Sequence, residues 1–325
     1  MILRELLAAL ATDDGISGSA LARRFGVTRA AVWKRIAQLR TWGVRVDARA
    51  GVGYSLAAPI DLLEPEVIRA AMDARSRKLL SALNVELDLD STNSAMNRAV
   101  GTPSGSVLFA ERQRQGRGRR GRAWQSPFGA NLYLSVLWRF DCGLAALGGL
   151  SLAVGVALAQ AVQALGVTGV RLKWPNDLVH DGRKLGGILI DAGGEWSGAC
   201  HAVIGIGINV RVPDAAAQHI DQPWTDLAHL LDPLPPRSHL AGVLLAHVLP
   251  ALQRFGQEGM TPFLDAWSEL DALTGRTIVV HENGNSWTAV AEGIDDAGLL
   301  RARDAQGMMH RLAAAEISVR VESPA

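Results

Sequence analysis

Residues 107–122, VLFAERQRQGRGRRGR, join a short apolar run to a string of four arginines and three glycines. The apolar run has the length and composition of a buried β-strand. Glycines let the next residues bend closely around a ligand, and arginines offer paired donors to phosphate or carboxylate oxygens. This arrangement favours a polyphosphate nucleotide at the strand end. A solvated basic loop or an RNA-binding segment has the same composition, so the surroundings must decide.

Strands and helices alternate on both sides of this string. Upstream, a strand is predicted at 85–90 and a helix opens at Ser91. Downstream, strands are predicted at 132–138, 170–174, 185–192 and 202–210, and a helix at 238–257. Asp181-Gly182 has the composition of a two-residue hairpin turn, which favours a mixed or antiparallel sheet. We therefore predict an α+β catalytic domain over residues 63–270, built on a mixed sheet.

The first 62 residues predict a separate winged helix-turn-helix domain. Ser17 and Thr28 are placed to cap two helices that Gly26 separates. The runs 44–46 and 54–56 flank two glycines and suit a two-stranded wing. An amphipathic pattern marks a helix before them, at Ile2, Leu3, Leu6, Leu7 and Leu10.

DNA is the expected partner of this N-terminal domain. Residues 1–58 carry nine Arg and Lys against four Asp and Glu. In the third helix, apolar positions Val32, Ile36 and Leu39 share one face. The predicted DNA-binding residues are Thr28, Arg29, Trp33 and Lys34, of which the last three occupy the opposite face, where they can reach phosphates and base edges. A protein-binding three-helix module would use the same scaffold, but the wing and the charge favour DNA.

Composition places the protein in the cytoplasm and outside the membrane. Cys142 and Cys200 show no metal-ligand spacing and follow no secretory leader, which argues against a disulfide framework. Residues 142–170 carry no charge and are long enough to span a bilayer. Glycines and glutamines dilute this run, so a packed core helix is favoured. The last 55 residues, 271–325, predict a small β-barrel with strands at 277–280, 287–292, 299–303 and 317–321.

Four further strings carry polar groups at the ends of predicted elements. They are Ser91-Thr92-Asn93, Lys173-Trp174-Pro175-Asn176-Asp177, Lys184-Leu185-Gly186-Gly187 and Gly205-Ile206-Gly207-Ile208-Asn209. Taken singly, each also fits a helix cap, a turn or a close-packed strand.

In this order, the strings resemble the biotin protein ligases, specifically the bifunctional type that also represses the biotin operon. The resemblance covers essentially the whole chain. It implies an α+β multidomain fold: a winged helix-turn-helix, a mixed-sheet catalytic domain resembling class II aminoacyl-tRNA synthetases, and an SH3-like β-barrel. Gly186 stands where the family pattern has alanine, and losing one methyl group is expected to alter the packing only slightly.

The resemblance also implies the reaction. Biotin's carboxylate attacks the α-phosphorus of ATP to give biotinyl-5′-AMP and pyrophosphate, and a lysine of the biotin carboxyl carrier protein then takes the biotinyl group. Mg²⁺ is expected to bridge ATP oxygens, although the sequence does not indicate its ligands. The adenylate-bound form is expected to be a homodimer that presents two winged helices to operator DNA.

The resemblance also implies site residues, at the positions that match the family's motifs. The biotin-binding residues are expected to be Ser91, Thr92, Asn93, Gln113, Gly116, Arg117, Gly118, Arg119, Trp124 and Lys184. The phosphate-binding residues are expected to be Arg117, Arg119, Arg120, Arg122, Lys173, Asn176, Lys184 and Asn209. The catalytic residues are expected to be Lys184, Arg119, Lys173 and Asp177, with Asp177 orienting or deprotonating the incoming lysine amine.

Three alternatives differ in substrate or class. A lipoate or other acyl-acid ligase would use a related fold, and the polar residues expected to bind the ureido ring discriminate against it. A ligand-sensing repressor without turnover would have no need of Lys184 and four loop arginines. A protein that binds nucleic acid through the arginine loop would retain that binding without residues 1–58.

Overall fold

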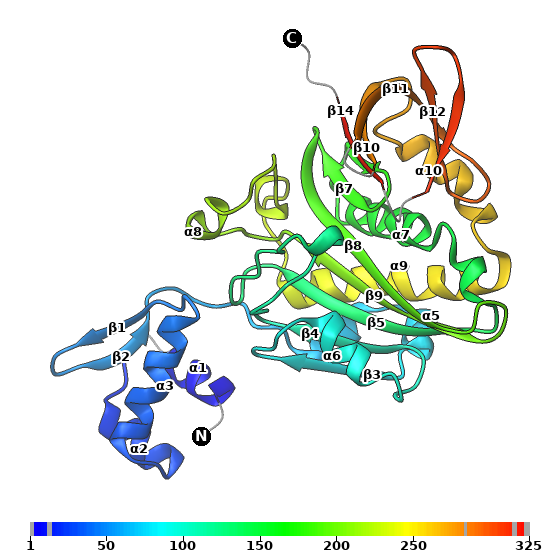
Figure 1. The fold of residues 1–325 in the computed structure, drawn as a ribbon. Helices are drawn as coiled ribbons and strands as arrows, with labels where there is room; N and C mark the ends of the chain where they lie inside the picture. Colours follow the sequence, from blue (N-terminus) through cyan, green and yellow to red (C-terminus); the bar gives the residue numbers. More distant parts are fainter. Residues whose placement is uncertain (1–2, 12–14, 283–284, 314–316, 322–325) are drawn as a thin grey trace.

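The computed structural model describes residues 3–11, 15–282, 285–313 and 317–321. Three units follow one another along the chain: an N-terminal helical unit with a small hairpin, a large central sheet, and a C-terminal set of strands (Figure 1). Ile2, part of the amphipathic pattern expected at the N-terminus, lies outside the described residues.

The N-terminal unit is a helix-turn-helix with a wing, as predicted. It contains α1 (Leu3–Leu10), α2 (Gly18–Phe25), α3 (Arg29–Thr41), β1 (Val46–Arg49) and β2 (Gly53–Leu56). Ser17 Oγ accepts from the Ala20 amide, and Thr28 Oγ1 accepts from the Ala31 amide, so both predicted caps are made. Gly26 ends α2 in the left-handed conformation with φ of 62°. The first wing strand begins at Val46, two residues later than predicted.

The central sheet has seven strands and mixed pairing. They are β3 (Ala82–Glu86), β4 (Ser106–Ala110), β5 (Leu132–Phe140), β6 (Val170–Lys173), β7 (Asp177–His180), β8 (Arg183–Gly194) and β9 (Cys200–Ile208), in the order β3-β4-β5-β9-β8-β7-β6. Only the β3–β4 pair is parallel. Asp181 and Gly182 both have positive φ, at 48° and 71°, which confirms the predicted hairpin turn.

Helices cover the two faces of this sheet unequally. On one face pack α7 (Leu150–Ala164) and α9 (Arg237–Glu258), together with α4 (Pro65–Ala71), α5 (Ala74–Leu79) and α10 (Leu264–Leu270). The other face carries α6 (Thr92–Arg98) against β4, β5 and β9 and is otherwise open. A short α8 (Asp214–Ala217) lies in the connection after β9. The open face leaves room for a ligand.

The charge-free stretch belongs to the protein core. Within the described part of the chain, Leu144–Ala164 is the one helical stretch long and apolar enough to cross a membrane, and 61% of its apolar window is buried. Its α7 segment packs against both the sheet and α9. This burial is that of a core helix, as predicted. The two cysteines are free thiols, Cys200 buried and Cys142 partly buried.

The predicted strand at 85–90 is displaced. The ladder of β3 ends at Glu86, and the next four residues run beside the segment after β4 instead, with Leu89 donating to Arg112 O and accepting from the Arg114 amide. Asp88 forms ion pairs with Arg112 and Arg114. These nonlocal contacts set the strand boundary.

The C-terminal unit is a five-stranded antiparallel sheet. Its strands are β10 (Thr277–Glu282), β11 (Asn285–Ile294), β12 (Leu300–Asp304), β13 (Met309–Leu312) and β14 (Ile317–Val321), in the order β13-β12-β11-β10-β14. All pairs are antiparallel, and no pairing of β13 with β14 occurs among the residues described. The closed barrel that was predicted is therefore not found. Trp174 Nε1 donates to Gly298 O at 3.2 Å and ties this unit to the central one.

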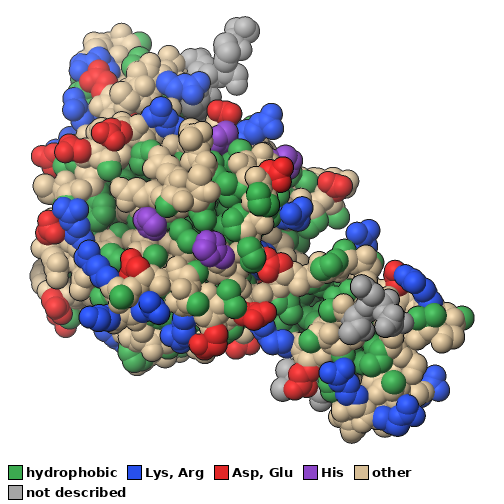
Figure 2. Space-filling view, turned by 180° about the vertical axis from the view of Figure 1, so that it is seen from behind, with side chains coloured by type: hydrophobic (Ala, Val, Ile, Leu, Met, Phe, Trp, Pro, Cys, Tyr) green, Lys and Arg blue, Asp and Glu red, His purple; other side chains and the backbone are tan. Residues whose placement is uncertain are grey.

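A buried ion pair joins the central sheet to the segment that leads out of the N-terminal unit. Arg237 Nη1 lies 2.7 Å from Glu111 Oε2, and the two side chains are 3% and 0% exposed. Glu111 also accepts from the Leu63 amide, and Arg237 donates to the backbone oxygen of Asp61. This network anchors residues 61–63. Figure 2 shows the N-terminal unit projecting from the rest of the molecule, with Lys and Arg side chains spread over its surface.

Candidate active site

A cavity of about 770 Å³ opens on the face of the sheet that α6 leaves free. Its wall is built from the start of α6, the arginine-rich loop, the turn between β6 and β7, and the middle of β8 and β9. Two segments distant in sequence complete it, at 219–223 and 272–276. The cavity therefore gathers nearly all the polar strings of the sequence in one place.

Glycines form the floor of the cavity. Gly205 and Gly207 lie two residues apart on β9, so both point to the same face, and Gly187 of β8 pairs with Gly207. A Cβ at Gly205 would lie 2.2 Å from Asn93 Oδ1, and one at Gly207 would lie 2.6 Å from the Trp124 ring. These glycines let Asn93 and Trp124 pack directly on the sheet.

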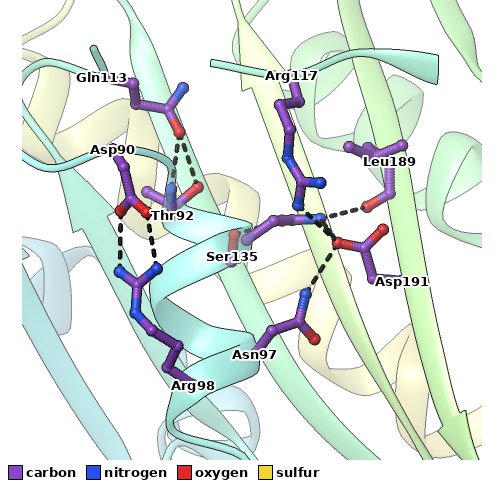
Figure 3. Close-up of polar contacts among 10 residues, drawn as sticks. Asp90, Thr92, Asn97, Arg98, Gln113, Arg117, Ser135, Leu189 and Asp191 are labelled. Atoms are coloured by element: carbon purple, nitrogen blue, oxygen red, sulfur yellow. Dashed lines mark hydrogen bonds and ion pairs between the residues drawn. The ribbon is translucent and has the colours of Figure 1, made fainter. Parts of the chain in front are cut away.

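Polar groups cluster at the start of α6. The Gln113 side-chain oxygen accepts from the Thr92 amide at 2.8 Å and from Thr92 Oγ1 at 3.2 Å (Figure 3). Gln113 Nε2 donates to Ser126 Oγ. Ser91 occupies the N-cap position but makes no side-chain cap bond. Its hydroxyl is thus not engaged in the capping role that a lone Ser-Thr-Asn string would suggest.

Asn93 is held by protein groups on both sides. Its Nδ2 donates to Leu189 O at 3.2 Å and to Asp191 Oδ2 at 3.1 Å, and its Oδ1 accepts from Ser135 Oγ at 2.6 Å. Both amide hydrogens are therefore used within the fold. Only acceptor capacity on Oδ1 is left for a ligand.

Besides this polar cluster, the cavity contains the Trp124 ring and the Lys184 ammonium group. Lys184 Nζ lies 5.4 Å from the centre of the Trp124 ring and 2.7 Å from Asp177 Oδ1. The Lys184 and Asp177 side chains are only 17% and 20% exposed. The indole N–H of Trp124 is buried and finds no acceptor among the described residues.

The arginine-rich loop brings further positive charge. Arg119 Nη1 donates to Asn176 Oδ1 at 3.4 Å, and Asn176 is itself fixed by a bond from Nδ2 to Ile188 O. Burial is the main cause that lowers the pKa of the Arg119 guanidinium. Asp177 opposes this shift, while the charges of Arg120 and Arg122 add to it. Arg119 still remains protonated at neutral pH and can meet an anion.

Most predicted site residues line this cavity. They are Ser91, Thr92, Asn93, Gln113, Arg117, Gly118, Arg119, Arg120, Arg122, Trp124, Lys173, Asn176, Asp177 and Lys184. Two others do not. Gly116 packs against Trp124 O and Ser126 Oγ. Asn209 donates from Nδ2 to the backbone oxygens of Lys184 and Thr225, and so it ties the ends of β8 and β9 to the following loop.

Several lining residues were not predicted from the sequence. His219, Asp221 and Gln222 come from the loop after β9, and Arg276 comes from the start of the C-terminal unit. No motif marks these positions, because the fold brings them in from a distance. The paired glycines at 205 and 207 were a usable signal, since their spacing of two on a strand indicates a bare face.

The four predicted DNA-binding residues are exposed and lie on α3 or at its N-cap. Arg29 and Trp33 of α3, with Arg49 and Val52 of the wing, line a concave surface between the helix and the hairpin. Trp33 is 63% exposed, and an apolar side chain of that size is more often buried or part of an interaction surface. Lys34 is exposed on the same helix, and Thr28 caps it.

Comparison with known proteins agrees with this geometry. Residues 87–209 match the biotin/lipoate A/B protein ligase family, and residues 2–55 match an HTH domain. The chain is 39% identical to the bifunctional ligase/repressor BirA of Escherichia coli (strain K12), over 97% of this chain and 96% of that protein. It is 28% identical to the bifunctional ligase/repressor BirA of Bacillus subtilis (strain 168), over 92% of each.

A solved structure supports the fold. The biotin protein ligase from Aquifex aeolicus in complex with biotin and ATP matches with a TM-score of 0.63 and 24% identity, covering 75% of this chain and 100% of that one. Fold and site thus define a protein ligase of the biotin/lipoate class that carries a helix-turn-helix domain. The chain belongs to the family of bifunctional ligase/repressors typified by BirA.

Proposed function

We propose that this protein activates biotin with ATP, transfers it to a lysine of the biotin carboxyl carrier protein, and represses biotin-synthesis genes through its winged helix. The observation that carries the proposal is that one cavity contains a polar pocket at α6, the Trp124 ring and the Lys184 ammonium. An acid with a polar head and an apolar chain would place its carboxylate at the cation.

Polar residues at the start of α6 would hold the ureido ring. A ureido group presents one carbonyl acceptor and two N–H donors, which must be paired when buried. Ser91 and Thr92 offer hydroxyl acceptors, and Asn93 offers a free lone pair on Oδ1. Gln113 orients Thr92 and keeps a donor hydrogen on Nε2. Trp124 would cover the apolar ring and chain, with Gly118 lining the cavity and Gly116 shaping it.

Cations would surround the reacting groups. In the first step an oxygen of the biotin carboxylate bonds to the α-phosphorus of ATP, and the bond to pyrophosphate breaks. Lys184 would stabilise negative charge on the carboxylate and α-phosphoryl oxygens during this exchange, with Lys173 and Arg119 beside it. Arg117, Arg120 and Arg122 are assigned to phosphates by the family resemblance, Asn176 positions Arg119 through its side-chain oxygen, and Asn209 would hold the strand that carries Lys184.

The second step forms an amide. A lysine amine of the carrier attacks the carbonyl carbon of the mixed anhydride, loses a proton, and AMP leaves with the bonding electron pair. Asp177 would accept that proton or orient the amine, because its carboxylate lies in the cavity next to Lys184. The Lys184 ammonium, 2.7 Å away, would hold the Asp177 carboxylate in place.

Mg²⁺ would act by neutralising phosphate oxygens. The described residues hold no cluster of three or more His, Cys, Asp or Glu side chains that could bind a metal alone. Mg²⁺ commonly takes one or two carboxylates, with phosphates and waters supplying the rest. Asp177 and Asp221 line the cavity and fit that mode, since ATP would bring the remaining oxygens.

The proposal also covers the three domains, the dimer and the DNA contacts. Residues 1–62 would form the DNA-binding domain, 63–270 the catalytic domain with the likeness to class II aminoacyl-tRNA synthetases, and 271–325 an SH3-like domain. Adenylate binding would favour a homodimer whose two winged helices meet the two halves of an operator. Thr28, Arg29, Trp33 and Lys34 would contact that DNA. The protein would work in the cytoplasm.

Pyrophosphate exchange tests the catalytic proposal. Incorporation of labelled pyrophosphate into ATP is measured with biotin, with lipoate and with no acid, using the wild type and Lys184→Ala. Exchange that requires biotin and falls in the variant supports the assignment. Exchange with lipoate alone would change the substrate, and none with either acid would leave a sensor that binds DNA.

A further inference from the structure

Asp191 of β8 receives three hydrogen bonds on one carboxylate oxygen. Oδ2 accepts from Asn97 Nδ2 at 2.9 Å, from Asn93 Nδ2 at 3.1 Å and from Arg117 Nη2 at 3.2 Å (Figure 3). The two asparagines come from α6 and the arginine from the glycine–arginine loop. Three separate elements thus meet at a carboxylate that has no role in the reaction described above.

The position of Asp191 places it at the far end of the cavity from the reacting groups. Every second residue of a strand points to the same face, so residues 187, 189 and 191 of β8 share one face. Gly187 and Leu189 line the cavity. A Cβ on Gly187 would lie 3.3 Å from Lys184 Nζ, so the ammonium sits at that level. Asp191 is four residues further along, roughly 13 Å away. Arg117 therefore reaches away from the phosphate-binding end.

We propose that Arg117 and Asp191 form a clasp that holds the glycine–arginine loop across the acid-binding end of the cavity, with Asn97 as its support. This inference rests on the proposed function, because it takes the bound acid to be biotin. Asp191 and Asn97 are positioning residues. Asp191 contacts Arg117 and Asn93, Asn97 contacts Asp191, and neither residue is part of the cavity lining. The clasp retains biotin and its adenylate. It engages the Arg117 guanidinium with Asp191, in place of the phosphate contact that the family resemblance implies for Arg117.

The strength of the contact suits a clasp that must open. The Arg117 and Asp191 side chains are 46% and 32% exposed, and ion pairs with such exposure are weak. Biotin can then enter when the pair separates. Asn93 and Asn97 still hold the carboxylate in place at that moment, so the loop returns to a fixed anchor. Because Asn93 is also part of the cavity floor, loop position and pocket shape are coupled.

Asp191→Asn tests the clasp with almost no change in shape. Dissociation of biotin should be faster by about fivefold, the size expected for a partly exposed ion pair, while the KM for ATP stays within about twofold. Trypsin should cut between residues 117 and 122 faster than in the wild type even without ligand, as read from fragment masses. That second readout does not depend on biotin being the substrate.

Two further variants sharpen the test. Glu258→Gln removes an ion pair of the same 3.2 Å length, Arg254–Glu258 on α9, and should leave both readouts unchanged. The variant Asn97→Ala removes one of the two amide donors that hold the Asp191 carboxylate, and it should also make loop cleavage faster. A rise in the KM for ATP with unchanged biotin release would overturn the proposal and return Arg117 to the phosphates. Wild-type release and cleavage rates in Asp191→Asn would overturn it as well, whereas a wild type that binds no biotin would instead remove the proposed function.

Discussion

The ammonium of Lys184 lies 2.7 Å from the Asp177 carboxylate, and both groups are largely shielded from water inside the cavity. The pair spans neighbouring strands, because Lys184 is the second residue of β8 and Asp177 is the first residue of β7. In the proposed reaction, Lys184 would stabilise the charge of the reacting carboxylate and Asp177 would act as the base beside it. Separate variants of the two residues can therefore distinguish the two half-reactions.

Lys184→Ala should reduce biotin-dependent pyrophosphate exchange by about 10²–10³-fold, the usual effect of removing one charged donor that stabilises a transition state. Asp177→Asn should spare adenylate formation more than transfer, because its proposed task begins with the incoming amine. Single-turnover measurement of biotinyl-5′-AMP formation, followed by addition of carrier protein, separates the steps. Equal and unchanged rates in Asp177→Asn would rule out its role.

Gly207→Ala should block the acid pocket by filling its floor. The added methyl group would lie 2.6 Å from the Trp124 ring, which must then shift towards the ligand. Biotin affinity should fall by about tenfold or more, measured by calorimetry. Gly101→Ala is the matched control, because a Cβ there meets nothing within 4 Å and its φ is not positive. Unchanged biotin affinity in Gly207→Ala would show that the floor is not the binding surface.

Local sequence signals predicted the N-terminal unit best. The caps at Ser17 and Thr28 depend on neighbours three residues away, so the sequence alone contains them. The strand β3 was displaced because its end depends on pairing with β4. The helices α4 and α5 were missed, since six or seven residues are too few for a periodic pattern.

The candidate site shows the same difference between local signals and contacts that depend on the fold. Contiguous strings such as residues 173–177 predicted lining residues, whereas His219 and Arg276 reach the cavity only through the fold. Asn209 also belongs to such a string, but it lies outside the cavity lining, and its Nδ2 donates to two backbone oxygens just after β9 ends at Ile208. Gly186 also proved tighter than expected: a Cβ would meet Ile208 Cδ1 at 2.5 Å and Gly207 O at 2.9 Å. The alanine of the family pattern would therefore require Ile208 and the strand to move.

Glu111→Gln should destabilise the catalytic domain strongly. It leaves the Arg237 guanidinium buried without its counter-ion, a change that commonly costs about 3–5 kcal/mol. The midpoint of urea unfolding, followed by tryptophan fluorescence, should fall accordingly. Glu258→Gln, which removes an exposed ion pair, serves as control and should shift the midpoint little. A matching small shift for both variants would contradict the proposed importance of the buried network.

Arg98→Ala should reduce stability at neutral pH, and the reduction should become smaller as the pH falls. Hydrogen bonding to the Arg98 guanidinium is the main cause that holds the pKa of Asp90 well below its usual range. A lowered folded-state pKa adds stability above the unfolded value of 3.8, and this stability is lost as the pH falls through the folded value. Because the Arg98 side chain is 63% exposed, solvent screens the ion pair and the loss at pH 7 should be small. Urea unfolding of both proteins from pH 7 to pH 3 should show the difference shrinking, and a constant difference would contradict this account.

The winged helix should bind DNA through charge and through one aromatic side chain, and these contributions can be separated by salt. Arg29→Ala and Lys34→Ala should weaken binding of the adenylate-loaded protein to its biotin-operon DNA and reduce the salt slope by about one each. Trp33→Ala should weaken binding with little change in slope, since an indole neutralises no phosphate. Lys78→Ala, an exposed lysine on α5, controls for general charge. Equal slopes in the wild type and both charge variants would place the DNA elsewhere on the molecule.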